Sequence, residues 1–181
     1  MFKRLLAALL LAIPFAAQAQ GAPTVVILVR HAEKGTTPAS DPPLTEAGKA
    51  RASALTAALA DANVQAVITT QLARTRDTGR PVAEARHVTP EVVSAAGAGH
   101  AQAVADAVRR HAGQTVLVVG HSNTVPAIIA ALGGPKLPDI CDSQYSSLYT
   151  LVLDGASVRL VRGSYGAASP DPADSCANAM R

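Results

Sequence analysis

Three separate stretches of the chain carry arginine or histidine at, or shortly after, the end of a short apolar run. Arginine presents a planar fork of N–H donors that matches the oxygens of a tetrahedral dianion two at a time. A neutral imidazole, in turn, is a competent nucleophile toward phosphorus. Side chains of these two types gathered at one point could bind a phosphate group and accept it on a nitrogen atom. The candidate catalytic residues are Arg30, His31, Arg74 and His121.

Two further polar residues, Ser122 and Asn123, follow His121 where a helix is predicted to begin. The first turn of a helix offers free N–H groups and the positive end of the helix dipole, and both favour a bound anion. We therefore predict that Ser122 and Asn123 contribute to substrate binding. The sequence contains no carboxylate–histidine cluster with metal-ligand spacing, so we expect neither a metal site nor a cofactor.

The apolar runs that precede these residues have the length and composition of strands. Residues 24–29, 65–69 and 115–120 are rich in Val and Ile, which is typical of strands buried on both faces of a parallel sheet. The carboxyl ends of parallel strands meet at one edge of the sheet, where open α/β folds bind their ligands. The candidate residues are therefore expected to converge there.

The segments between these runs alternate between helical and extended patterns. This alternation predicts an α/β fold, a three-layer sandwich with a mostly parallel central sheet. Pro81 is expected to divide or kink one of the helices. The predicted helices are 45–61 with Thr45 as N-cap, a segment opening at Thr70, 101–112, and a helix from about 122 to 132. The further predicted strands are 88–93, 147–153 and 156–161, the last two joined by the turn Asp154-Gly155.

The N-terminus has the three-part pattern of a secretory signal. Residues 1–4 are basic, residues 5–15 are almost wholly apolar, and Ala17 and Ala19 supply the small residues before a cleavage site. We predict a signal peptide over 1–19, a single domain over 20–181, and a periplasmic or secreted protein without a membrane contact after cleavage. An uncleaved membrane anchor is the alternative.

The charge pattern of the chain argues against one class of partner. The formal charge of +3 falls to +1 once Lys3 and Arg4 leave with the predicted signal. The remaining sequence has no run of Lys and Arg and no aromatic series for base stacking, so we do not expect a nucleic-acid partner.

Two cysteines, Cys141 and Cys176, lie in the last quarter of the chain. Export to an oxidising compartment would permit a disulfide between them, and their spacing is not that of a metal site. The alternative is a pair of free thiols.

Four motifs, in this order along the chain, resemble the histidine phosphatase superfamily, the group that includes phosphoglycerate mutases and phosphohistidine phosphatases. The resemblance implies a phosphoglycerate mutase-like fold. It also implies that His31 is the phosphate-accepting nucleophile and that Arg30, Arg74 and His121 form the rest of the phosphate pocket. Asn123 matches an asparagine common in the mutase-like branch. The motifs are Arg30-His31-Ala32-Glu33-Lys34, Leu44-Thr45-Glu46-Ala47-Gly48, residues 72–78 and Gly120-His121-Ser122-Asn123.

The sequence departs from the family pattern at three places. Ala32 stands where the family usually has glycine, and Ser122 stands where another branch has aspartate. Residues 94–99 contain no carboxylate, although many members carry a general acid after the third strand. The general acid is therefore unassigned. The nearest carboxylates along the sequence are Glu33, Glu84 and Glu91.

The other histidines and the tyrosines have no spacing that suggests a site. We interpret the histidines as surface residues and the tyrosines as packing residues. They are His87, His100, His111, Tyr145, Tyr149 and Tyr165.

The sequence as a whole predicts an exported, metal-independent phosphatase. It would hydrolyse phosphomonoesters or a phosphoprotein through a phosphohistidine on His31. A non-catalytic protein that binds phosphorylated ligands and a phosphomutase are the alternatives. The physiological substrate and the oligomeric state stay open.

Overall fold

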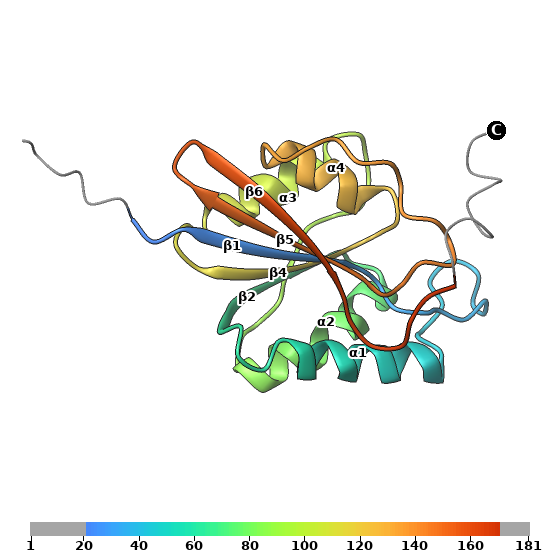
Figure 1. Ribbon diagram of the computed structural model, residues 1–181. Helices are drawn as coiled ribbons and strands as arrows, with labels where there is room; N and C mark the ends of the chain where they lie inside the picture. Colours follow the sequence, from blue (N-terminus) through green and yellow to red (C-terminus); the bar gives the residue numbers. More distant parts are fainter. Residues whose placement is uncertain (1–20, 171–181) are drawn as a thin grey trace, which may run out of the picture.

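The computed structural model describes residues 21–170 (Figure 1). The predicted signal peptide, its cleavage site and Cys176 lie outside these residues, so the signal, the domain start and the disulfide pairing stay predictions. Cys141 is not a free thiol. None of the helices within 21–170 combines the length and the apolar character that crossing a membrane requires.

A mixed six-stranded sheet runs through the middle of the molecule, in the strand order β3-β2-β4-β1-β5-β6. The first four strands along the chain are parallel to one another, whereas β5 is antiparallel to its neighbour β1 and β6 is antiparallel to β5. The bounds are β1 Thr24–Arg30, β2 Val64–Thr69, β3 Glu91–Val92, β4 Thr115–Gly120, β5 Ser147–Asp154 and β6 Ser157–Ser164.

Two pairs of helices cover the two faces of the sheet, as Figure 1 shows. On β1, Ile27 and Val29 face the core beneath α1 and α2, whereas Val26 and Leu28 face the core beneath α3 and α4. This alternation buries β1 on both faces, which confirms the three-layer α/β sandwich that the apolar runs predicted. The bounds are α1 Glu46–Ala58, α2 Ala73–Arg86, α3 His100–Arg109 and α4 Thr124–Ala131.

Several predicted bounds differ from the structure: α1 ends at residue 58 instead of 61, α3 at 109 instead of 112, and β6 at 164 instead of 161. Helix α2 continues through Pro81 and so is not divided there, because the loss of one backbone hydrogen bond is offset by a buried face that includes Val82 and Ala83. Strand β3 has two residues instead of six, since only Glu91 and Val92 pair with β2. The hairpin turn lies one residue later than predicted, because Asp154 pairs with Ser157 and so belongs to the strand.

Candidate active site

His31 follows β1 at the carboxyl edge of the parallel strands and is 4% exposed. Its backbone N–H donates to the Gly120 carbonyl at 2.9 Å, which ties it to the end of β4. Its Nδ1 lies 2.8 Å from the Ala32 carbonyl. A carbonyl oxygen can only accept, so Nδ1 carries the proton and Nε2 carries the lone pair. The tautomer is thus the one that a nucleophile attacking through Nε2 requires.

The surroundings keep this imidazole neutral. Burial lowers the pKa of His31 to about 3, and the charges of Arg30, His121 and Arg74 act in the same direction, against a smaller opposing effect of the Ala32 carbonyl. At neutral pH the ring is therefore uncharged, which leaves the lone pair available for attack on phosphorus.

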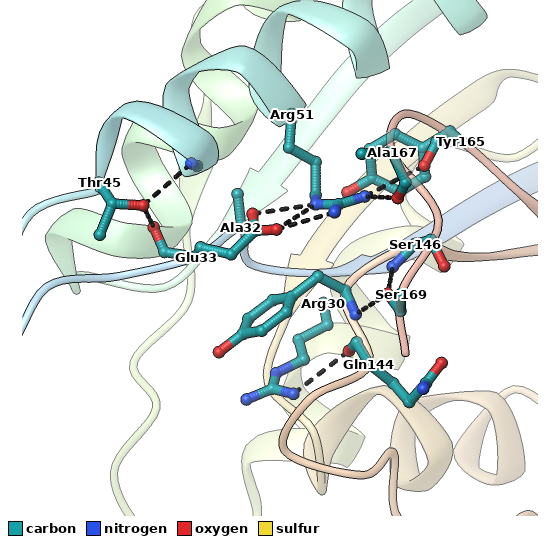
Figure 2. Close-up of polar contacts among 12 residues, drawn as sticks. Arg30, Ala32, Glu33, Thr45, Arg51, Gln144, Ser146, Tyr165, Ala167 and Ser169 are labelled. Carbon is teal, nitrogen blue, oxygen red and sulfur yellow. Dashed lines mark hydrogen bonds and ion pairs between the residues drawn. The ribbon is translucent and has the colours of Figure 1, made fainter. Parts of the chain in front are cut away.

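Arg30, the last residue of β1, is held from the far side by the loop that precedes β5. Its Nη1 donates to the carbonyls of Cys141 and Asp142, both at 2.9 Å, and of Gln144 at 3.2 Å. The guanidinium carbon lies 4.3 Å from the centre of the Tyr145 ring, a distance typical of a cation–π contact. Figure 2 shows the bond to Gln144. The Nε atom is buried and has no hydrogen-bond partner among residues 21–170.

Arg74 lies in the first turn of α2, where the Asp41 carboxylate accepts from the Ala73 backbone N–H at 2.9 Å. The same carboxylate is 3.9 Å from Arg74 Nη1, so the two groups form only a long ion pair. Arg74 Nε, like Arg30 Nε, is buried and lacks an acceptor in the described part of the chain. Buried donors are nearly always paired, so two unpaired donors from two arginines indicate a place for an anionic ligand.

His121 follows β4, and its ring centre lies 5.4 Å from that of His31. Its Nε2 is 3.4 Å from Thr70 Oγ1, and its backbone N–H donates to Thr124 Oγ1 at 2.9 Å. Burial, followed by the charges of Arg74, His100 and Arg30, lowers the pKa of His121 to about 4. The structure thus brings the four predicted catalytic residues into one electrostatic environment, while their individual roles stay predictions.

The two predicted substrate-binding residues lie directly after His121. Ser122 is half-buried, and its carbonyl accepts from the Ile140 N–H at 2.9 Å. Asn123 is exposed at the N-terminus of α4 and makes no side-chain capping hydrogen bond. Both positions are compatible with a ligand over the helix N-terminus, and their function stays a prediction.

The ring of Tyr145 packs on Arg30, in keeping with the predicted packing function, and lies 6.3 Å from the ring of His31. One interpretation of a single residue was wrong. His100 is not on the surface: it is 5% exposed at the start of α3. Its burial depends on the path of the loop after β3, which no local pattern reports. Asp41 was also missed, since nothing in the sequence around it points to the start of α2.

The carboxylates nearest in sequence all have other partners. Glu33 makes a two-pronged contact with Arg51 at 2.8–2.9 Å (Figure 2). Burial by itself would raise the pKa of Glu33, but the hydrogen bonds and charge of Arg51 outweigh burial and lower it. Glu84 is exposed beside Arg80, and Glu91 pairs with Arg110. None of the three is placed as a proton donor for the site. No group of three or more His, Cys, Asp and Glu residues within 21–170 could hold a metal ion.

Ala32 fits the position that glycine usually takes in the family. Its side chain is fully buried against Leu44 and Ala52, and its N–H donates to Thr78 Oγ1 at 2.9 Å. The methyl group therefore fills a small space between β1 and α1 and leaves the backbone beside His31 in place.

The sequence profile described as "Histidine phosphatase superfamily (branch 1)" matches residues 26–96. This range includes Arg30, His31 and Arg74, whereas His121 lies beyond it. The resemblance that the four motifs indicated is thereby confirmed. No curated protein is similar enough in sequence to this chain to count as a match.

Several solved structures share the fold. Bacillus stearothermophilus YhfR is 20% identical with a TM-score of 0.61, over 76% of this chain and 95% of that one. The protein histidine phosphatase SixA complexed with tungstate is 20% identical with a TM-score of 0.63, over 77% and 96%. The mycobacterial glucosyl-3-phosphoglycerate phosphatase Rv2419c is 17% identical with a TM-score of 0.60, over 81% and 100%. At these identities the likeness shows a common fold. Together with the family match, it supports a phosphatase enzyme that acts on a phosphorylated substrate.

Proposed function

We propose that this chain is an exported, metal-independent phosphatase that hydrolyses phosphomonoesters or a phosphoprotein through a phosphohistidine on His31. Its structural neighbours include a protein histidine phosphatase and a sugar-phosphate phosphatase, so the proposal covers both kinds of substrate. Export rests on the pattern of residues 1–19.

The tautomer of His31 is the observation that carries the proposal. Because Nδ1 donates to the Ala32 carbonyl, Nε2 is the atom that can form a bond to phosphorus. The phosphoryl group moves to Nε2 as the bond to the leaving group breaks, and water then attacks the phosphohistidine to release inorganic phosphate. The low pKa of His31 favours the attacking form at neutral pH.

Two arginines supply the charge that such a transfer requires. Phosphoryl transfer depends mainly on positioning and on stabilising the charge of the transferred group. Arg30 and Arg74 each present an unpaired Nε, and the side chain of Arg30 is already held in place by three carbonyls. Metal independence is part of the proposal, because these guanidinium groups can neutralise the phosphate themselves. Turnover unchanged by EDTA is the expected result, and loss of activity restored by a divalent cation would contradict it.

Trapping of the phosphoenzyme tests the central claim. The purified protein is mixed with a ³²P-labelled phosphomonoester, quenched without acid, and digested so that the labelled peptide can be mapped. We expect label on the peptide that contains His31 in the wild type, and none in His31→Ala. Retained activity in His31→Ala, or label on the His121 peptide, would contradict the assignment. Binding of phosphate without any label or turnover would favour a binding protein, and transfer of label to a second site of the substrate would favour a mutase.

Protein recovered from the producing cells tests export. A mature N-terminus near Gln20 in the periplasmic or secreted fraction is the expected result. An intact Met1 in the membrane fraction would favour the uncleaved anchor.

A further inference from the structure

A third buried histidine, His100, has no function in the two-histidine scheme. His100 is 5% exposed, and its Nδ1 lies 2.7 Å from the Ser94 carbonyl. Because that carbonyl can only accept, Nδ1 carries a proton, and Nε2 is the ring nitrogen that can exchange a proton with a ligand. Nδ1 thereby donates to this carbonyl in both the neutral ring and the imidazolium, which differ only at Nε2.

The Nε2 atom of His100 is buried and has no hydrogen-bond partner in the described residues. Only six side-chain atoms of the described residues share this condition, and two of the others are the Nε atoms of Arg30 and Arg74. A buried polar atom without a partner is rare in a folded protein and is often explained by a ligand or a catalytic function. The Nε2 atom of His100 is therefore available to a ligand, as the two unpaired arginine donors are.

A series of hydrogen bonds fastens His100 to the edge of the sheet where His121 lies. The loop after β3 pairs with the end of β2, because the Val93 N–H donates to the Thr69 carbonyl at 2.9 Å. The Ala95 N–H donates to Gln71 Oε1 at 2.9 Å, directly beside Thr70, which contacts His121. A positive charge on His100 lowers the pKa of His121, so the two rings act on each other electrostatically.

We propose that His100 is the general acid of the reaction and that the site is thereby fitted to phosphomonoesters of alcohols. The inference rests on the proposed function, since it completes that reaction. No carboxylate of residues 94–99 is available, and Glu33, Glu84 and Glu91 have other partners. The carboxylates of Asp41 and Asp142 face Arg74 and Arg30, so the His100 imidazolium is the candidate acid beside His121.

His100 loses one proton in the first half of the proposed reaction and regains one in the second half. His31 Nε2 forms the bond to phosphorus while the bond from phosphorus to the ester oxygen breaks, and that oxygen takes the proton from His100 Nε2. The neutral His100 keeps its Nδ1 proton on the Ser94 carbonyl. In the second half, His100 Nε2 takes a proton from the attacking water while the phosphorus–nitrogen bond breaks.

The dependence of rate on the leaving group separates an acid from a structural histidine. An alkyl alkoxide is a poor leaving group that needs a proton, whereas p-nitrophenolate leaves without one. His100→Asn removes Nε2 but keeps an amide N–H for the Ser94 carbonyl, which makes it the test variant. His111→Asn is the matched control, because His111 contacts Gln114 and Glu91 away from the site.

We expect His100→Asn to lower kcat/KM for an alkyl phosphate at least about 100-fold, in the range of general acid catalysis, and for p-nitrophenyl phosphate less than about fivefold. His111→Asn should leave both rates unchanged. Equal losses on both substrates, or no loss on either, would overturn the inference. If the melting curve shows that His100→Asn does not fold, His100→Gln is measured in its place. The same two losses of kcat/KM, for the alkyl phosphate and for p-nitrophenyl phosphate, are then compared. If the wild type forms no phosphoenzyme, the proposed function itself is refuted. If the wild type turns over but His100→Asn loses equal activity on both substrates, only this inference is refuted.

Discussion

Two buried arginines, Arg30 and Arg51, are used in opposite ways (Figure 2). Each is 5% exposed, and each is anchored by carbonyls from the C-terminal part of the chain. Arg51 has a partner for every nitrogen: the Glu33 carboxylate for Nε and Nη2, and the carbonyls of Tyr165 and Ala167 for Nη1. Arg30 directs only Nη1 to carbonyls within 3.2 Å and leaves Nε unpaired.

The difference teaches how a binding arginine can be told from a structural one. Burial is the same for both, so burial does not distinguish them. What distinguishes them is the number of donors left without a protein acceptor, because a buried unpaired donor costs free energy unless a ligand completes it. By this measure we predict that Arg30 and Arg74 bind the ligand, whereas Arg51 holds the chain together.

The largest expected effect comes from breaking the structural pair. Arg51→Met leaves the Glu33 carboxylate without its cation and releases the two carbonyls of the C-terminal segment, so we expect the free energy of unfolding to fall by about 3 kcal/mol. Urea denaturation measures the change. The double variant Glu33→Gln/Arg51→Met is the control and should recover part of the loss, since it removes the uncompensated charge. An unchanged midpoint for Arg51→Met would contradict the structural function.

At Arg74 we expect a loss of phosphate affinity with little change in stability. Arg74→Ala removes a charge-assisted contact with phosphate, worth about 1.5–3 kcal/mol, which corresponds to a loss of roughly 10- to 150-fold in phosphate affinity. Its ion pair with Asp41 is 3.9 Å long, so the free energy of unfolding should change by less than about 1 kcal/mol. Phosphate titration by calorimetry and urea denaturation measure the two quantities. Slow formation of phosphoenzyme should persist, because His31 is intact. A large loss of stability with unchanged phosphate binding would show that Arg74 is a structural arginine and not a phosphate-binding one.

The pH dependence of stability tests the buried histidines. Burial lowers the pKa of His31 to about 3, whereas an unfolded histidine titrates near 6.5, so between these values the unfolded chain binds more protons than the folded one. Stability contributed by a neutral His31 is therefore complete above about pH 6.5 and is lost as pH falls toward 3, with a slope of up to about 1.4 kcal/mol per pH unit. Urea denaturation at stepped pH should show a shallower slope for His31→Asn. An equal slope in both proteins would exclude a neutral, buried imidazole.

The smallest effect is expected at Asp41. Asp41→Ala removes the acceptor for the first N–H of α2, and loss of such a cap costs about 1 kcal/mol. Phosphate affinity should not fall, since no donor to phosphate is lost. Thermal denaturation and the phosphate titration check both parts. A stability loss without any change in affinity supports Asp41 as a support for the helix, and weaker phosphate binding would show that it positions Arg74.

The sequence by itself determined the layered fold and the four residues at the sheet edge. Apolar runs of β-branched residues are local signals of buried parallel strands, and the geometry of such strands brings their carboxyl ends together. Arg30, His31 and His121 follow directly from this rule, because each lies at the end of its strand. Gly48 of the second motif has a reason that only the structure shows: a Cβ there would lie 2.1 Å from the Glu33 carbonyl oxygen.

Tertiary structure alone decided how those residues are held and which others join them. The ring of Tyr145 over Arg30, the burial of His100 and the pairing of Glu33 with Arg51 all depend on the paths of loops. Residue type carries little information about such contacts, since a tyrosine, a histidine or a glutamate is equally compatible with the surface. Periodicity reports which face of an element is buried, whereas long-range contacts are selected by the packing of the whole chain, where every buried polar group needs a partner.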